Sequence, residues 1–180
     1  MDRLDAIFSP KSLAVVGAST TPGKVGHDIF VNILNGKYTG TLYPVNPKAP
    51  SVACVKAYPT LTDIPDDIDL AMIILPPRLA LKSTKDAIDK GVKGIVIVSA
   101  GFREVGGEGL EIENKIVALC KDAGVRVIGP NCLGVINPNP DIRLNASFSA
   151  RMPESGNVSF ISQSGCLLYT SDAADESSRG

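Results

Sequence analysis

Residues 12–26 have the sequence SLAVVGASTTPGKVG, which gives the clearest indication of the fold class. Its first part, Ser12–Val16, is a compact apolar run between Pro10 and Gly17, which is typical of a strand buried on both faces. A glycine-containing turn follows and ends at Gly26. Beyond it, apolar residues recur at helical spacing and predict an amphipathic helix: Ile29, Phe30, Ile33 and Leu34. The stretch therefore forms a strand–turn–helix unit.

The same alternation continues along the chain. Short apolar runs predict further strands at 41–45, 70–75, 94–98 and 125–128. Helices are expected before or between them, at 2–8, 79–90 and 110–124. Strands that alternate with helices in units of about 25–30 residues indicate a parallel sheet with right-handed crossovers. The predicted fold class is α/β, with a Rossmann-like, doubly wound parallel sheet.

A change in composition marks the end of this domain. Residues 137–155 are rich in Pro, Asn and Ser, as interdomain connections are. We therefore expect a ligand-binding domain at 1–136, a connection at 137–155, and at 156–165 the first strand of a truncated second domain. The tail, 166–180, is expected to be a sequencing-adapter artefact, because 166–176 matches the translation of a transposase adapter used in sequencing libraries.

Charge and composition narrow the function classes. The formal net charge is -1 and 44% of the residues are hydrophobic, so the chain is an ordinary globular protein. No positive field favours nucleic acid or a membrane surface, and neither is expected as a partner. The N-terminus lacks the features of a signal peptide, and the longest apolar stretch, 70–77, is too short to span a bilayer. We expect a cytoplasmic protein. The four cysteines have no metal-ligand spacing, so no metal site is expected.

The turn after the first strand is the candidate ligand site. Ligands of doubly wound sheets bind beyond the carboxyl ends of the strands, where a helix N-terminus favours phosphate. Glycines let the backbone approach such a ligand closely, and three hydroxyl residues add donors: Ser19, Thr20 and Thr21. No acid/base pair is apparent elsewhere, since Asp66, Asp67 and Asp69 are expected to form a solvated turn.

The spacing of the glycines in this turn helps to distinguish between the possible phosphate ligands. A P-loop has the pattern GxxxxGK followed by Ser or Thr. Here five residues separate Gly17 from Gly23, and no hydroxyl residue follows Lys24. An NAD site has the pattern GxGxxG and an acidic residue after the second strand. Here Ser19 replaces the middle glycine, and the second strand leads to Lys48. A lysine there favours a ribose phosphate, which leaves NADP and coenzyme A (CoA) open.

Five motifs occur in register along the chain: GASTTPGKVG at 17–26, YPVNPK at 43–48, VSAGF at 98–102, GPNCLGV at 129–135 and ISQSG at 161–165. Together they resemble the CoA-binding domain of NDP-forming acyl-CoA synthetases, such as ADP-forming acetate–CoA ligases. The α subunit of succinyl-CoA synthetase is a more distant relative. The resemblance covers residues 1–165 and implies that the second domain is flavodoxin-like.

The resemblance implies a role for each motif. Lys48 would meet the phosphoadenosine end of CoA, Pro76 and Pro77 would line the adenine or pantetheine path, and Asn131 would lie near the thiol. The residues that would cradle the phosphates are Gly17, Ala18, Ser19, Thr20, Gly23, Lys24 and Val25. Those that would follow the pantetheine arm are Val98, Ser99 and Ala100.

The resemblance also implies the reaction of the whole enzyme, in which acyl-CoA, phosphate and ADP are interconverted with carboxylic acid, CoA and ATP. The phosphorylated histidine of the family lies in the second domain, so His27 is expected to be a surface residue and no residue here is predicted to be catalytic. ATP, ADP and Mg would belong to an ATP-grasp module outside this sequence. The fragment alone is expected to be inactive, and the parent protein oligomeric.

Two other interpretations stay open. One is a non-catalytic, regulatory CoA-binding module fused to an acetyltransferase. The other is an NADP-dependent oxidoreductase, although no hydride-transfer partner is visible in the sequence.

Overall fold

A computed structural model describes residues 4–149 and 151–162 of the chain. The helices are α1 (Asp5–Phe8), α2 (Val25–Asn35), α3 (Pro77–Asp89) and α4 (Gly107–Asp122), with 3₁₀ turns η1 (Leu61–Asp63) and η2 (Arg103–Val105). The strands are β1 (Ser12–Val16), β2 (Thr41–Val45), β3 (Ser51–Val52), β4 (Val55–Lys56), β5 (Leu70–Ile73), β6 (Gly94–Ile97), β7 (Arg126–Ile128), β8 (Gly134–Asn137) and β9 (Leu144–Ser147).

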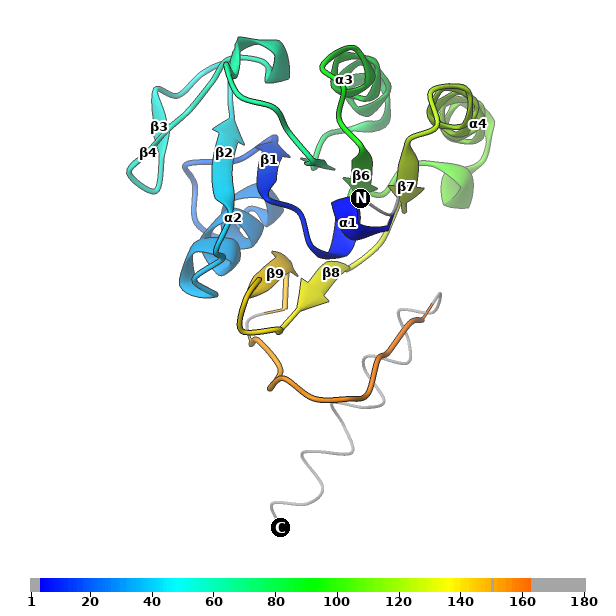
Figure 1. Cartoon of the computed structure of the whole chain (residues 1–180). Coiled ribbons are helices and arrows are strands. Elements are labelled where there is room, and N and C mark those ends of the chain that lie inside the picture. Colours follow the sequence, from blue (N-terminus) through cyan, green and yellow to red (C-terminus); the bar gives the residue numbers. More distant parts are fainter. Residues whose placement is uncertain (1–3, 150, 163–180) are drawn as a thin grey trace.

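The central sheet has five parallel strands in the order β2-β1-β5-β6-β7 (Figure 1). The chain first moves outward from β1 to β2, then returns to the other side of β1 and continues to β7. This reversal between β1 and β5 is the topological switch point of a doubly wound sheet. The predicted Rossmann-like α/β fold is confirmed.

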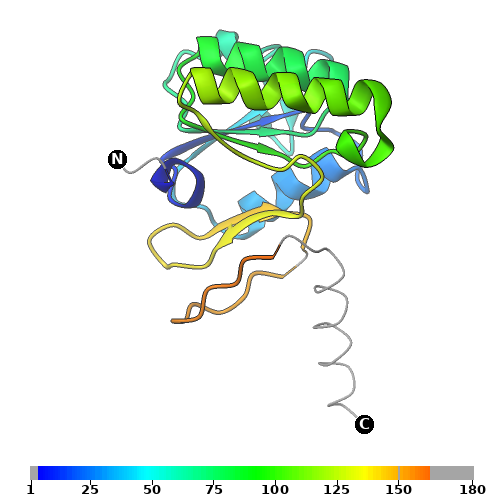
Figure 2. The same ribbon diagram turned by 90° about the vertical axis from the view of Figure 1, so that its right-hand side faces the viewer.

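Both faces of the sheet are covered (Figure 2). Leu13 and Val15 face a layer made of α1, α2 and the β8–β9 hairpin, whereas Ala14 and Val16 face α3 and α4. Every one of these four side chains is at most 5% exposed. Because successive strand residues point to opposite faces, a strand buried on both faces must be apolar throughout. That requirement is why the short apolar runs predicted the strands.

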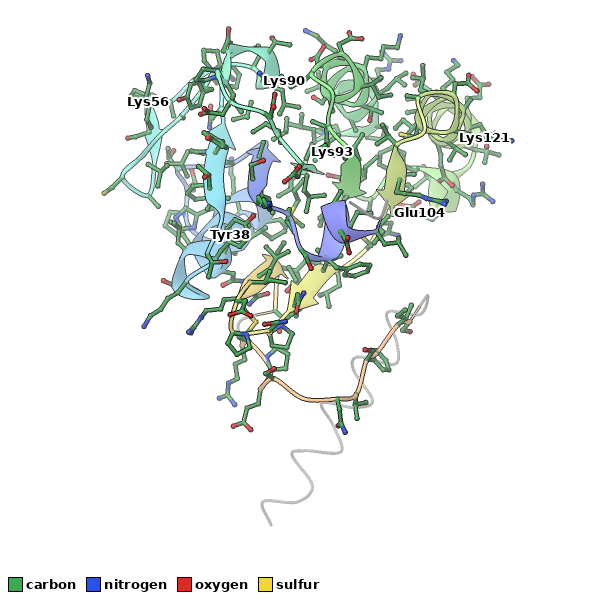
Figure 3. All side chains as sticks on the ribbon, viewed as in Figure 1. Tyr38, Lys56, Lys90, Lys93, Glu104 and Lys121 are labelled. Atoms are coloured by element: carbon green, nitrogen blue, oxygen red, sulfur yellow. The ribbon has the colours of Figure 1, made fainter. Side chains whose placement is uncertain are left out.

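The amino ends of three central strands are joined by one carboxylate. Asp69 directly precedes β5, Lys11 precedes β1 and Lys93 precedes β6. The Asp69 carboxylate accepts the Lys11 N–H at 2.9 Å and lies 2.6 Å from the Lys93 ammonium (Lys93 is labelled in Figure 3). Its own carbonyl accepts the N–H groups of Lys93 and Gly94. Asp69 is 6% exposed, so its expected place in a solvated turn is wrong.

The environment of Asp69 favours its ionised form. Burial alone raises the pKa of this carboxyl group, but the hydrogen bonds from Lys93 and the Lys11 N–H outweigh burial and leave the pKa lowered. The charge therefore stabilises the sheet at neutral pH.

The segment expected as an interdomain connection, 137–155, contains strand β9. β9 pairs antiparallel with β8 and packs against α2, where the Asn32 amide donates to the carbonyls of Ser147 and Ser149 at 3.0 Å each. Residues 158–161 form no strand, and Val158 is 89% exposed. Assignment of 156–165 to a second domain stays a prediction, and the tail at 166–180 lies outside the described residues.

No helix among the described residues is long and apolar enough to cross a membrane.

Candidate ligand-binding site at the carboxyl edge

The carboxyl ends of the central strands meet at one edge of the sheet. Hydrogen bonds continue the ladder one step beyond the strands, from Gly17 N–H to Val45 at 3.1 Å and from Ile74 N–H to Val16 at 2.8 Å. A third bond joins the Val98 N–H to the Ile73 carbonyl at 3.1 Å. The loops after β2, β1, β5 and β6 therefore start side by side, as ligand-binding loops do in this type of sheet.

Two glycines give the first of these loops its shape. Gly17 has a φ of +94°, and a Cβ there would lie 2.4 Å from the Ile74 carbonyl oxygen. A Cβ on Gly26 would lie 2.1 Å from the Gly17 carbonyl oxygen. Only glycine fits at either position, because the loop, the start of α2 and the end of β5 touch through their backbones.

Three consecutive N–H groups in this loop point to an anionic ligand. The N–H groups of Ala18, Ser19 and Thr20 have no acceptor among the residues that the structure describes. The Ser19 hydroxyl accepts the Thr21 N–H at 3.1 Å, which curls the loop toward the N-terminus of α2. Successive unpaired backbone donors in a loop that leads into a helix can form a cradle of the kind that binds phosphate.

Other predicted residues of this loop are already partnered or exposed. The Gly23 N–H donates to the Asp28 carboxylate at 3.1 Å, so Asp28 occupies a donor that the sequence suggested for the ligand. His27 Nδ1 lies 3.2 Å from the same carboxylate, and its side chain is only 19% exposed rather than on the open surface. The side chains of Lys24 and Val25, at the start of α2, are exposed beside the loop.

The loop after β2 is tied to the first loop by Asn46. Its side-chain amide donates to the Ala18 carbonyl at 2.7 Å, and its side-chain oxygen accepts the Lys48 N–H at 2.8 Å. Lys48 itself is exposed. The two loops that were predicted to hold phosphates are therefore in direct contact.

The remaining predicted residues continue the same rim. Pro76 and Pro77 start α3, and a Cβ on Gly101 would lie 3.3 Å from the Pro77 ring. The Asn131 N–H donates to the Ser99 carbonyl at 2.9 Å. Among the residues predicted after β6, Val98 is buried, Ser99 is half-buried and Ala100 is exposed. The structure thus brings the predicted residues together in one chain of neighbouring loops, from Lys48 to Asn131.

The loop after β6 differs from the first loop in that one of its own carboxylates accepts two of its N–H groups. The Glu104 carboxylate (labelled in Figure 3) accepts the N–H groups of Gly101 at 2.6 Å and Phe102 at 3.2 Å. The Gly101 N–H is the main reason that the pKa of Glu104 is lowered. The Glu104 carboxylate thus takes up two donors that a ligand could otherwise use, whereas no carboxylate accepts the N–H groups of Ala18, Ser19 and Thr20 in the described part of the chain.

Two contributors were missed as site residues in the sequence. Asn46 and Gly26 lie within quoted motifs, but the sequence carries no signal that Asn46 would reach Ala18 or that Gly26 would touch Gly17. The number of residues between Asn46 and Ala18, or between Gly26 and Gly17, does not predict that they touch.

The fold and this loop define a class of protein, namely a doubly wound α/β domain with a row of unpaired backbone donors at its switch point. Comparison with known proteins is more specific. Residues 11–138 match the family described as the CoA binding domain. The chain belongs to this family.

The proteins to which the chain is similar include ADP-forming acid–CoA ligases. The chain is 47% identical over 166 residues to an ADP-forming acetate–CoA ligase of Methanocaldococcus jannaschii, covering 92% of this chain and 23% of that protein. It is 41% identical over 170 residues to an ADP-forming 4-hydroxybutyrate–CoA ligase of Nitrosopumilus maritimus, covering 93% and 24%. The chain thus spans about a quarter of the length of these relatives.

A solved structure agrees with the fold in detail. The "dinucleotide forming" acetyl-coenzyme A synthetase 1 of Ca. Korarchaeum cryptofilum, described in complex with phosphate and ADP, superimposes with a TM-score of 0.87. Sequence identity is 40%, and the match covers 97% of this chain and 37% of that chain.

Proposed function

We propose that this chain binds CoA at the carboxyl edge of its sheet, as one part of an ADP-forming acid–CoA ligase. The single observation that supports this most is the row of unpaired N–H groups at Ala18, Ser19 and Thr20, beside the loop that bears Lys48. The cradle suits a pyrophosphate, and an exposed lysine next to it suits the further phosphate on the ribose of CoA.

The order of loops along the rim suits the order of chemical groups in CoA. In this proposal, the 3′-phosphate is at Lys48, the pyrophosphate at 18–20, and the pantetheine arm passes Pro77 and Ser99. The thiol then lies near Asn131. The contacts between neighbouring loops support this order, since each loop touches the next.

The parent reaction interconverts acyl-CoA, phosphate and ADP with carboxylic acid, CoA and ATP. This chain contributes the CoA site, and phosphoryl transfer, ATP and Mg belong to domains or subunits that it contacts in the parent enzyme. We assign no catalytic role to its residues and expect the chain alone to be inactive. The parent assembly is proposed to be oligomeric and cytoplasmic.

The proposal is tested by calorimetric titration of the chain with CoA, dephospho-CoA and NADPH. CoA should bind more tightly than dephospho-CoA, which lacks only the 3′-phosphate. Lys48→Ala should reduce CoA affinity about tenfold and dephospho-CoA affinity little, because a charge-assisted contact contributes roughly 1.5 kcal/mol or more. Lys121→Ala, on an exposed lysine in the last turn of α4 (Figure 3), is the matched control and should change neither affinity.

Preferential binding of NADPH would overturn the assignment. Equal loss of CoA and dephospho-CoA affinity in Lys48→Ala would remove Lys48 from the 3′-phosphate while leaving CoA as the ligand.

A further inference from the structure

Asn46 connects three segments that come from different parts of the chain. Its backbone N–H donates to the Tyr58 carbonyl at 2.9 Å, which anchors it beside β4. Its side-chain amide donates to the Ala18 carbonyl at 2.7 Å, and its side-chain oxygen accepts the Lys48 N–H at 2.8 Å. The half-buried side chain therefore uses both of its polar ends on the two loops of the candidate site.

The bond to Ala18 sets the direction of a donor in the cradle. A trans peptide is planar, with its C=O and N–H pointing in opposite directions. The peptide between Ala18 and Ser19 is trans, since the described chain has its one cis bond at Gly129–Pro130. When Asn46 holds the Ala18 carbonyl, the Ser19 N–H must point away from Asn46 and stay available to a ligand.

The bond to Lys48 sets the path of the second loop. An asparagine oxygen that accepts an N–H two residues later closes an Asx-turn. Pro47 lies inside this turn and has a restricted φ, so the backbone of Lys48 has little freedom. One side chain thus fixes Lys48 and the phosphate cradle relative to each other.

We propose that Asn46 is a positioning residue for CoA, which orients the cradle through Ala18 and the ribose-phosphate lysine through Lys48. This inference rests on the proposed CoA function. It makes a prediction that a purely structural role does not, because the two bonds can be broken separately and should affect different parts of the ligand.

The test compares two variants at Asn46 by titration of the full chain with CoA and dephospho-CoA. Asn46→Ala removes both bonds, so CoA affinity should fall by about tenfold or more and the preference for CoA over dephospho-CoA should shrink toward one. Asn46→Asp keeps the acceptor for the Lys48 N–H but places a carboxylate against the Ala18 carbonyl. It should weaken CoA and dephospho-CoA alike, by about fivefold, and retain the preference.

Asn137 offers a matched control because it makes the same pair of bonds elsewhere. Its amide donates to the Phe8 carbonyl at 2.7 Å and its oxygen accepts the Asn139 N–H at 3.1 Å. Asn137→Ala should lower the stability of the fold while leaving both affinities unchanged. If Asn46→Ala does not fold, Asn46→Asp alone decides, and unchanged affinity in that variant would overturn the inference.

The outcomes separate this inference from the function on which it rests. If the wild-type chain does not prefer CoA over dephospho-CoA, the proposed 3′-phosphate site is wrong, and so is the proposed role of Asn46. The positioning role alone would be overturned if the wild type prefers CoA and both Asn46 variants keep this preference at full affinity. It would also be overturned if the Asn46 variants lose no more CoA affinity than Asn137→Ala does.

Discussion

The two edges of the central sheet use polar groups in opposite ways. At the amino edge, the Asp69 carboxylate is buried and is bonded to the Lys11 N–H and the Lys93 ammonium. At the carboxyl edge, the N–H groups of Ala18, Ser19 and Thr20 have no acceptor in the described part of the chain. The amino edge satisfies these donors internally, whereas the loop after β1 leaves three consecutive donors available for a ligand.

Stability and ligand binding therefore depend on residues at opposite ends of the same strands. A buried carboxylate stabilises a fold where its charge-assisted hydrogen bonds join separate strands, as those of Asp69 do. Unpaired backbone donors in a loop contribute no hydrogen bond to the free fold but can bind an anion. Substitutions at the amino edge should therefore affect unfolding, and those at the carboxyl edge should affect binding. A residue of the carboxyl edge that is in close backbone contact with its neighbours should affect both.

The largest effect is expected at Gly17, where one substitution should affect both unfolding and binding. A Cβ there would meet the Ile74 carbonyl and would also have to adopt a φ of +94°. Gly17→Ala should destabilise the fold by about 3 kcal/mol or more and abolish CoA binding. Gly91→Ala is the matched control, because Gly91 has a φ of +81° but open space around it, and should cost only about 1 kcal/mol. Denaturant unfolding measures both, and equal losses would disprove the close contact at Gly17.

The second largest effect is expected at Asp69, at the amino edge. Asp69→Asn should lower the free energy of unfolding by about 2 kcal/mol at pH 7, since it weakens charge-assisted hydrogen bonds to a buried group. CoA affinity should not change. Asp67→Asn, at an exposed neighbour, should leave both quantities unchanged. A loss of CoA affinity in folded Asp69→Asn protein would show that the two edges are not independent.

The effect of Asp69 should also depend on pH with a defined sign. Because its folded-state pKa is lowered, its contribution is complete above the unfolded pKa, about 3.9, and is lost as the pH falls through the folded value. The stability difference between wild type and Asp69→Asn should be constant from about pH 5 to 7 and shrink below about pH 4. A difference that persists unchanged at lower pH would contradict the ion pair.

The smallest effect concerns an ion pair at the carboxyl edge. Arg78 and Glu108 join the first turns of α3 and α4 at 2.7 Å, but their side chains are 80% and 58% exposed. Solvent screens such a pair, so Arg78→Ala should leave the denaturation midpoint within experimental error of wild type. A drop as large as that of Asp69→Asn would mean that the carboxyl edge also holds the fold together.

The parts of the fold that could be predicted are those with a repeating physical requirement. Strands such as β1 and β5 are buried on both faces and had to be apolar throughout, so their positions were evident. β9 was missed because its sequence, Leu-Asn-Ala-Ser, is half polar, and its buried Asn145 and Ser147 bond to each other. That pairing depends on the final packing, not on a pattern in the chain.

The candidate site likewise has features that the sequence predicted and features that it did not. The glycine loop and Lys48 were predicted because their spacing and sequence type carry the chemistry. The unpaired donors at 18–20, the use of the Gly23 N–H by Asp28 and the contact of Asn46 with Ala18 were not, because each depends on which groups meet in space.

In the proposed complex, the unpaired N–H groups of residues 18–20 receive the phosphates of CoA. The direct measurement is the change in backbone amide NMR shifts when ¹⁵N-labelled chain is titrated with CoA. The largest changes should fall on Ala18, Ser19 and Thr20, and the amides of Lys11 and Gly94 at the amino edge should not move. Saturating CoA that leaves 18–20 unchanged, or that shifts the amino edge instead, would contradict the account.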